Sequence, residues 1–157
     1  MINTILSDFS HVILFPKDKI YTGKLNALND ILLNKYGDYD FFNYFEFNQP
    51  LLDFYKSLKE KYSINIFTSG TVQNNFSVRK IIDQIFDNIY TAKDYGVNKT
   101  DSTAYELIAK KLNRKTNDIF FVDDQKENLQ AAEEAGMTTV LYKDILQFKK
   151  EAKKVLT

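Results

Sequence analysis

Three segments with acidic or hydroxyl side chains come directly after short apolar runs of this chain, and a lysine lies between two of them. These positions are Asp8, Thr68 and the pair Asp123–Asp124, and the lysine is Lys99. Carboxylate oxygens are the ligands that Mg²⁺ prefers, and carboxylates packed closely repel each other unless a cation lies among them. An aspartate that faces a metal-bound phosphate is also a competent nucleophile, while hydroxyl and ammonium groups hold phosphate oxygens. If the fold brings these positions together, they predict a site for phosphoryl chemistry with Mg²⁺.

The elements around these positions alternate between strands and helices. Strands are expected over residues 3–7, 64–68, 89–92, 118–122 and 138–142. Helices are expected over residues 22–36, 50–61, 72–86, 102–113, 126–135 and 144–155. This alternation indicates a parallel sheet with helices on both faces. The predicted fold class is therefore α/β, a Rossmann-like three-layer sandwich with a parallel five-stranded sheet.

The predicted sheet brings the polar positions to one edge. In open parallel sheets, ligands bind outside the carboxyl ends of the strands, and Asp8, Thr68 and the pair Asp123–Asp124 all fall there. Neighbouring strands lie about 4.8 Å apart. If the first and fourth strands are neighbours, Asp8 and Asp124 can therefore ligate one Mg²⁺.

Residues 15–49 interrupt the alternation after the first strand. We expect them to form a small α-helical cap insert over the same edge of the sheet, and residues 1–14 and 50–157 to form the core domain. Two interpretations of the aromatic side chains in the insert are open: they line a substrate pocket, or they build the core that a short insert needs. The cluster consists of Tyr39, Phe41, Phe42, Tyr44, Phe45 and Phe47.

The composition excludes several classes of site. The 157 residues suit one domain with a core and a small insert. Lys+Arg and Asp+Glu both number 21, and this balance argues against a nucleic-acid binder that acts through a broad basic field. The chain has no cysteine and a single histidine, His11, so cysteine-based and multi-histidine metal sites are excluded. Without a signal-peptide pattern or an apolar run of about 20 residues, we expect a cytoplasmic protein with no membrane contact.

The order and spacing of the polar segments resemble the haloacid dehalogenase-like (HAD) superfamily, in the subfamily I branch that carries a small helical cap after the first motif. Residues 5–14 stand at the nucleophile loop of that family, residues 66–70 at its second motif, and residues 96–106 at its lysine motif. Residues 120–137 are similar to the fourth motif and carry the most specific part of the resemblance. The resemblance covers nearly the whole chain and implies a hydrolase that uses Mg²⁺.

The resemblance also implies a role for each acidic position. Asp8 would be the nucleophile and a Mg²⁺ ligand, and the backbone carbonyl of Ser10 would be a second ligand. Asp124 would bind Mg²⁺ directly, with Asp123 nearby or acting through water. Asn128 would help to order the loop after the fourth strand.

Four residues are candidates for a phosphate-binding site. Thr68 and Lys99 would be catalytic and would hold the phosphoryl group. The backbone N–H groups of Ser69 and Gly70 open onto a helix and would hold further phosphate oxygens. The expected substrate is a phosphorylated compound, and the sequence specifies neither its identity nor the oligomeric state.

The first motif departs from the resembled family at two positions. Phosphatases of that family carry aspartate where this chain has Ser10, and usually glycine where it has His11. The aspartate protonates the leaving oxygen and later activates the hydrolytic water, whereas a serine hydroxyl has no proton to give near neutral pH. Loss of a positioned general acid typically lowers a rate by about 10²–10⁴. His11 is either a substitute acid–base group or a loop residue without a catalytic role.

Three functions fit these residues. The first, which we predict, is a HAD-like hydrolase that cleaves phosphate monoesters with Mg²⁺ through an aspartyl-phosphate on Asp8. Its activity would be impaired to the extent that Ser10 fails to replace the usual acid. The second is a catalytically degenerate HAD-fold protein that binds Mg²⁺, phosphate or a partner. The third is a slow phosphotransfer protein, in which the aspartyl-phosphate persists because no group activates water.

Overall fold

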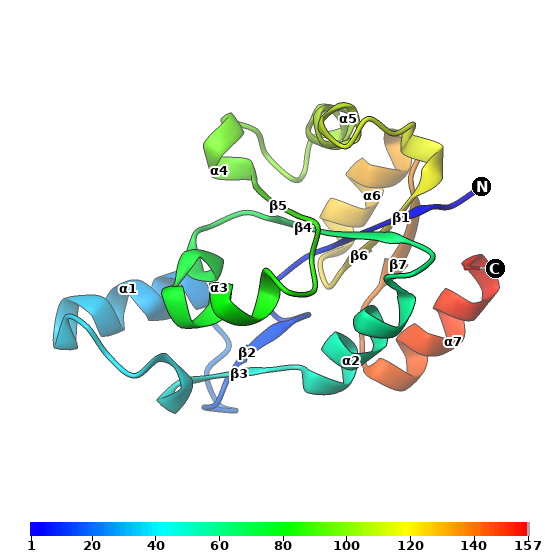
Figure 1. Ribbon diagram of the computed structural model, residues 1–157. Coiled ribbons are helices and arrows are strands. Elements are labelled where there is room, and N and C mark those ends of the chain that lie inside the picture. The colour runs from blue at the N-terminus through cyan, green and yellow to red at the C-terminus, as the bar shows by residue number, and fades with distance from the viewer. Residues whose placement is uncertain (157) are drawn as a thin grey trace.

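Five parallel strands form the centre of the computed structural model, which describes residues 1–156 (Figure 1). Along the sheet, the strands follow the order β5 (Asn88–Thr91), β4 (Ser63–Thr68), β1 (Thr4–Ser7), β6 (Ile119–Asp123) and β7 (Thr138–Leu141). The predicted α/β class and parallel five-stranded sheet are therefore confirmed, and each strand lies within one residue of its expected bounds.

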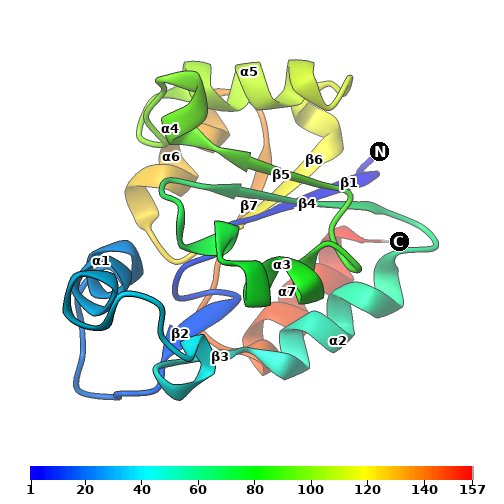
Figure 2. The ribbon, with the colours of Figure 1, turned by 60° about the vertical axis from the view of Figure 1, so that its left-hand side comes forward.

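Helices cover both faces of this sheet (Figure 2). One face carries α2 (Gln49–Leu58), α3 (Phe76–Ile82) and α7 (Ile145–Val155). The other carries α4 (Ala92–Tyr95), α5 (Ser102–Lys111) and α6 (Lys126–Glu134). The central strand β1 is buried on both sides, with Ile5 in the core that includes α2 and α7 and Leu6 in the core that includes α5 and α6. Because successive side chains of a strand point to opposite faces, every residue of this central strand is buried, including Thr4 and Ser7 at its ends.

Parallel pairing brings the carboxyl ends of β1, β4 and β6 to one edge. β1 lies between the other two strands, with Ser7 opposite both Ile66 and Val122. The backbone N–H of Asp8 donates to the carbonyl of Val122 at 2.8 Å and so continues the pairing beyond β1. The groups that follow these strands in the sequence therefore lie side by side.

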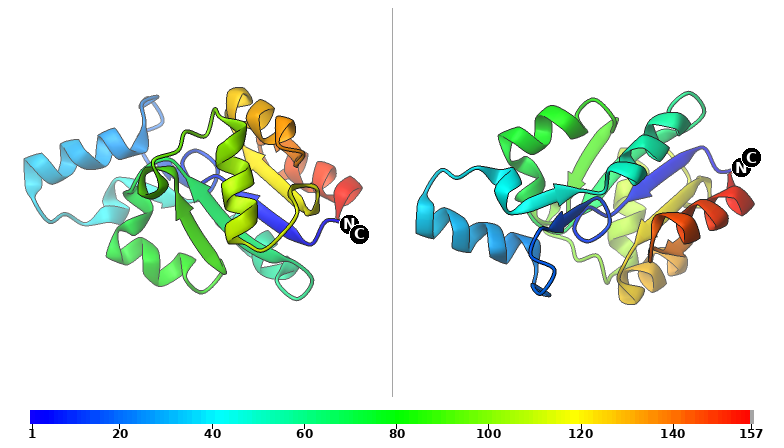
Figure 3. Two further views of the ribbon diagram at one scale, coloured as in Figure 1. Left: turned by 90° about the horizontal axis from the view of Figure 1, so that it is seen from above. Right: turned by 90° about the horizontal axis from the view of Figure 1, so that it is seen from below.

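The segment between β1 and α2 extends from this edge, away from the N-terminal end of the chain and from the end of α7 (Figure 3). It contains α1 (Leu25–Tyr36), a 3₁₀ turn η1 (Phe41–Asn43) and an antiparallel ribbon of β2 (Leu14–Pro16) with β3 (Phe45–Phe47). The helix begins three residues later than the expected range 22–36 and ends as expected at Tyr36, before Gly37, whose φ of 66° favours glycine. The ribbon departs from the purely helical insert that we expected, because strands of 3 residues are too short to show alternation.

The aromatic side chains of the insert pack against one another. Phe41 stacks on Phe45 with ring centroids 4.4 Å apart, and Tyr39 meets Tyr44 edge-on at 5.6 Å. Both phenylalanines are buried. No member of the aromatic cluster lines the cavity described below, so the interpretation of the cluster as the core of the insert is supported.

One expected helix is divided in two. The segment predicted as a helix over residues 72–86 is a 3₁₀ turn η2 (Val72–Asn74) followed by α3, because the Asn75 side chain accepts a hydrogen bond from the N–H of Ser77 at 2.9 Å and begins a new helix. A further 3₁₀ turn, η3 (Thr116–Asp118), precedes β6. Within residues 1–156, no helix combines the length and apolar character needed to cross a membrane.

Candidate active site

Three carboxylates meet at the carboxyl edge of the sheet. Asp8 follows β1, Asp123 ends β6, and Asp124 comes next. One carboxylate oxygen from each lies within 4.8 Å of the others. A set of donors made only of carboxylate oxygens matches the coordination chemistry of Mg²⁺. The residues present therefore fit a divalent cation, and the expected approach of Asp8 to Asp124 is observed.

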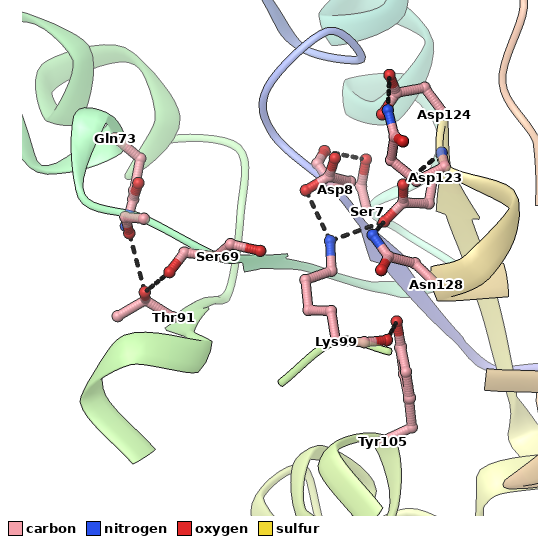
Figure 4. Close-up of polar contacts among 12 residues, drawn as sticks. Ser7, Asp8, Ser69, Gln73, Thr91, Lys99, Tyr105, Asp123, Asp124 and Asn128 are labelled. Carbon is pink, nitrogen blue, oxygen red and sulfur yellow. Dashed lines mark hydrogen bonds and ion pairs between the residues drawn. The ribbon is translucent and has the colours of Figure 1, made fainter. Parts of the chain in front are cut away.

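Lys99 lies among these carboxylates (Figure 4). Its Nζ donates to Oδ1 of Asp8 at 2.8 Å and to Oδ2 of Asp123 at 2.7 Å. The rings of Phe67 and Phe121 lie beside it, with centroids 5.5 and 5.4 Å from Nζ. One buried ammonium group cannot neutralise three carboxylates, so the site retains the negative charge that a divalent cation needs.

Burial shifts the ionisation of this cluster. It raises the pKa of Asp8 to about 7; the charge on Lys99 opposes this shift and the charge on Asp123 adds to it. Burial acts to lower the pKa of Lys99, but the charges on Asp8 and Asp123 outweigh it and raise that pKa. Burial and the charge on Asp123 also raise the pKa of Asp124. A bound cation would favour the ionised forms of Asp8 and Asp124, the two carboxyl groups whose pKa values are raised.

Asp123 and Asp124 have different surroundings although they are adjacent. Asp123 is fully buried, and its Oδ1 accepts from the N–H of Gln125 at 2.8 Å while its Oδ2 accepts from Lys99 and from Nδ2 of Asn128 at 3.1 Å. Asp124 is half-buried and lines the cavity in front of the cluster. Asp123 therefore binds Lys99, Asn128 and the backbone of the loop after β6, whereas Asp124 faces the cavity. The roles of Asn128 in ordering the loop and of Asp124 as a Mg²⁺ ligand stay predictions.

A cavity of about 320 Å³ opens in front of the acids. The core contributes most of the residues predicted from the sequence, but neither Asp123 nor Gly70. It also contributes Gln125, and the insert contributes a continuous stretch, residues 22–26, none of which the sequence analysis singled out. The lining consists of Asp8, Ser10, His11, Thr22, Gly23, Lys24, Leu25, Asn26, Thr68, Ser69, Lys99, Asp124, Gln125 and Asn128. The insert therefore closes one side of the site, as a cap would.

The loop after β4 contributes two of its three predicted residues to the cavity. Thr68 ends β4 and is buried, and Ser69 follows it into the lining. Gly70 is not part of the lining; its carbonyl accepts from Oγ1 of Thr91 at 2.9 Å, and its Cα faces the side chain of Asn26. The role of the Gly70 N–H in phosphate binding stays a prediction.

The two unusual positions of the first motif have distinct environments. Oγ of Ser10 is buried and has no hydrogen-bond partner within the described chain. His11 has a φ of 60°, in the left-handed region that glycine adopts most easily and that histidine enters more often than most residues. Its Nε2 lies 3.2 Å from the carbonyl oxygen of Gly23, so the ring connects the first motif to the insert. Ser10 and His11 both line the cavity.

The fold and this site define an α/β protein with an acidic centre at the carboxyl edge of a parallel sheet. Residues 19–142 match the family described as haloacid dehalogenase-like hydrolase. The chain belongs to this family, which confirms the resemblance read from its motifs.

Two curated relatives share part of the sequence. The chain is 30% identical over 119 residues to the bifunctional epoxide hydrolase 2 of Rattus norvegicus, an alignment that covers 69% of this chain and 21% of the rat protein. It is 35% identical over 105 residues to the enolase-phosphatase E1 of Aquifex aeolicus, covering 60% of this chain and 46% of that protein. The chain thus spans about a fifth of the length of the rat protein and less than half of the length of the Aquifex protein.

Solved structures share the whole fold at low sequence identity. A protein from Porphyromonas gingivalis described as a predicted HAD-like family hydrolase superimposes with a TM-score of 0.68 at 14% identity, covering 99% of this chain and 98% of that one. A HAD family enzyme from Bacteroides thetaiotaomicron, in complex with magnesium and inorganic phosphate, gives 0.66 at 15% identity, covering 91% and 95%. These likenesses show that the insert and the core together follow a known architecture.

Proposed function

We propose that this hydrolase cleaves phosphate monoesters with Mg²⁺ through a covalent aspartyl-phosphate on Asp8. The observation that carries this proposal is the meeting of Asp8, Asp124, Thr68 and Lys99 around one cavity. The complex of the Bacteroides enzyme with magnesium and inorganic phosphate, and the name of the Aquifex enolase-phosphatase, support phosphate as the group that this family site accepts.

Each residue has a separate part in the reaction. Asp8, Asp124 and the backbone carbonyl of Ser10 would hold Mg²⁺, which when bound would neutralise charge on the phosphoryl oxygens. A carboxylate oxygen of Asp8 attacks phosphorus, and the bond from phosphorus to the ester oxygen breaks with its electron pair leaving on that oxygen. Lys99 and the Thr68 hydroxyl bind the other phosphoryl oxygens. Water then attacks the same phosphorus, and the bond from phosphorus to the Asp8 oxygen breaks with its electron pair returning to the carboxylate. The protons of the water leave on the released inorganic phosphate.

Ser10 limits the esters that can react quickly. The leaving oxygen needs a proton unless it is stable as an anion, and a serine hydroxyl does not supply one near neutral pH. Aryl phosphates release a stabilised phenolate, whereas alkyl phosphates release an alkoxide. We therefore expect this site to favour phosphates with good leaving groups.

The experiment is steady turnover of p-nitrophenyl phosphate. We expect release of nitrophenolate that needs Mg²⁺ and disappears in Asp8→Asn, because an amide is a poor nucleophile. Asp53→Asn is the matched control, since Asp53 lies on the exposed surface of α2, where it accepts from Nε2 of Gln49. Failure of the purified protein to hydrolyse any member of a broad phosphate panel with Mg²⁺ would contradict the proposal.

A second candidate is a degenerate member that binds Mg²⁺ and phosphate without efficient turnover. The unpartnered Oγ of Ser10, at the position of the general acid in related phosphatases, favours it. The two candidates separate with p-nitrophenyl phosphate, whose leaving group needs no general acid: steady turnover by the wild type identifies a hydrolase, and binding of Mg²⁺ and phosphate with almost no turnover identifies a degenerate member.

A further inference from the structure

The loop after β4 is held from the core side through its carbonyl groups (Figure 4). Oγ1 of Thr91 donates to the carbonyls of Ser69 at 3.2 Å and Gly70 at 2.9 Å. Nε2 of Gln73 donates to the carbonyl of Gly70 at 2.7 Å, and Gln73 is fully buried. The loop that carries Thr68 therefore has its acceptors fixed by residues of the core.

The donors of the same loop are bound by the insert. Oδ1 of Asn26, in the first turn of α1, accepts from the backbone N–H groups of Thr71 and Val72, both at 2.8 Å. Two N–H donors that converge on one atom require an acceptor there, so they also fix which end of the carboxamide is oxygen. One side chain of the insert thus satisfies two consecutive amides of the core.

Gly70 makes room for this side chain. A Cβ added at Gly70 would lie 2.1 Å from Nδ2, 2.3 Å from Cγ and 2.4 Å from Oδ1 of Asn26. Gly70 is not among the glycines with positive φ, so its backbone would accept another residue. A side chain at position 70 would therefore have to displace the Asn26 side chain, whereas the conformation of the chain would tolerate it.

We propose that Asn26 is a positioning residue that holds the loop after β4 in the conformation that binds phosphate. Asn26 lines the same cavity as Thr68 and Ser69, which come shortly before the amides that it binds. With the amides of Thr71 and Val72 fixed by the insert and the carbonyls of Ser69 and Gly70 fixed by the core, Thr68 and Ser69 have one orientation toward the cavity. Docking of the insert and formation of the anion site are then a single event. This inference rests on the proposed function, since it concerns the same phosphate.

The test compares Asn26→Ala with Asn29→Ala on the same helix. Asn29 accepts from the hydroxyl of Tyr39 and does not line the cavity, so its variant also loses a hydrogen bond of the insert but leaves the loop untouched. The probe is inorganic phosphate with Mg²⁺, and its Kd is measured by calorimetry. We expect Asn26→Ala to weaken phosphate binding about tenfold or more, which corresponds to one or two lost hydrogen bonds, and Asn29→Ala to leave it unchanged.

Gly70→Ala supplies a second, independent test. The added methyl group displaces the Asn26 side chain, so we expect the same loss of phosphate affinity as in Asn26→Ala. The double variant should lose no more than either single one, because the methyl group then has free space. Amide hydrogen exchange at Thr71 and Val72 should accelerate in both single variants, and Asn26→Asp, which keeps an acceptor oxygen, should retain the protection.

The outcomes separate this inference from the proposed function. Equal phosphate affinity in the wild type and Asn26→Ala, or unchanged exchange at Thr71 and Val72, would overturn the role of Asn26. A wild type that binds phosphate but hydrolyses no ester would refute the proposed function. The role of Asn26 would then still be decided by the phosphate Kd and by the amide hydrogen exchange of Thr71 and Val72. A wild type that binds no phosphate would overturn both.

Discussion

Nζ of Lys99 lies 2.8 Å from Oδ1 of Asp8, although the two residues are 91 positions apart in the sequence. Both side chains are almost completely buried. Removing two charges from water costs more than their attraction returns in many proteins, so a buried ion pair is weak support for a role in stability. The pair also shares its lysine with Asp123, at the edge of the sheet where ligands bind. This arrangement indicates that the buried charges serve the binding of a ligand and not the stability of the fold.

Replacement of Lys99 by methionine should destabilise the protein strongly. Methionine keeps the apolar stem beside Phe67 and Phe121 but leaves the buried Asp8 and Asp123 without their partner. Breaking a buried ion pair from one side costs about 3–5 kcal/mol. The measurement is urea unfolding in the presence of EDTA. Lys154→Met is the control, because the Lys154–Glu151 pair is exposed and such pairs contribute less than about 1 kcal/mol. Equal losses in the two variants would contradict the prediction.

The positions of Asp8, Lys99 and Asp124 could be predicted because they depend on the order of strands and helices along the chain, which can be read from the sequence. Alternating strands and helices place strand ends at one edge, and the neighbouring positions of β1 and β6 then bring Asp8 to Asp124. The run of four apolar residues in β6 is typical of a central strand, whereas β1 has only Ile5 and Leu6 between two polar residues and is identified by its place before the first polar segment.

The insert could be predicted only in outline. The pairing of β2 with β3 joins two strands of 3 residues each, and neither is long enough to show alternation. The role of Asn26 left no signal either, because one asparagine in a helix is ordinarily a solvated residue. Its contact depends on the packing of α1 against the loop after β4, which is a tertiary property.

The stabilisation of the protein by Mg²⁺ should increase with pH. Burial raises the pKa of Asp8 from 3.8 to about 7 in the folded chain, so this group contributes stability at low pH and loses that contribution as pH rises toward 7. Lys99, whose pKa is raised, keeps its charge throughout this range. Since Mg²⁺ binds the ionised carboxylate, the difference in Tm between Mg²⁺ and EDTA should be small near about pH 5 and larger near about pH 8.

The matched variant for this pH dependence is Asp8→Asn. Its side chain cannot ionise, so the growth of the Mg²⁺ effect with pH should shrink to the part contributed by Asp124, whose pKa is also raised by burial. A Tm difference in the wild type that is the same at both pH values would show that Asp8 is not the group that exchanges a proton for the cation.

Ser10→Asp should increase turnover in a manner that depends on the leaving group. Restoring a positioned general acid should raise the rate with an alkyl phosphate by about 10²–10⁴. The same change should have little effect with p-nitrophenyl phosphate, because nitrophenolate leaves without a proton. Ser10→Asn is the control of similar size that has no acidic proton, and it should show no such gain. An equal factor for both substrates would indicate that the introduced carboxyl group acts on the water and not on the leaving oxygen.

Tyr105 positions the backbone of Lys99, and Tyr105→Phe isolates that contact. The Tyr105 hydroxyl donates to the carbonyl of Lys99 at 2.8 Å in the interior. Phenylalanine keeps the ring contacts with Phe67 and Phe121, whose centroids lie 5.6 and 5.0 Å away. The variant therefore leaves a buried carbonyl without its donor, which should lower the free energy of unfolding by about 1–3 kcal/mol.

Urea unfolding of Tyr105→Phe beside Tyr95→Phe checks this expectation. Tyr95 is 38% exposed, so its hydroxyl can exchange any partner for water, and its variant should change the unfolding free energy by less than about 0.5 kcal/mol. Equal stability of the two variants would mean that the Lys99 carbonyl finds another donor once the hydroxyl is gone. In that case the contacts of Nζ with Asp8 and Asp123 would suffice to place the lysine, and the Tyr105 hydroxyl would have no part in building the site.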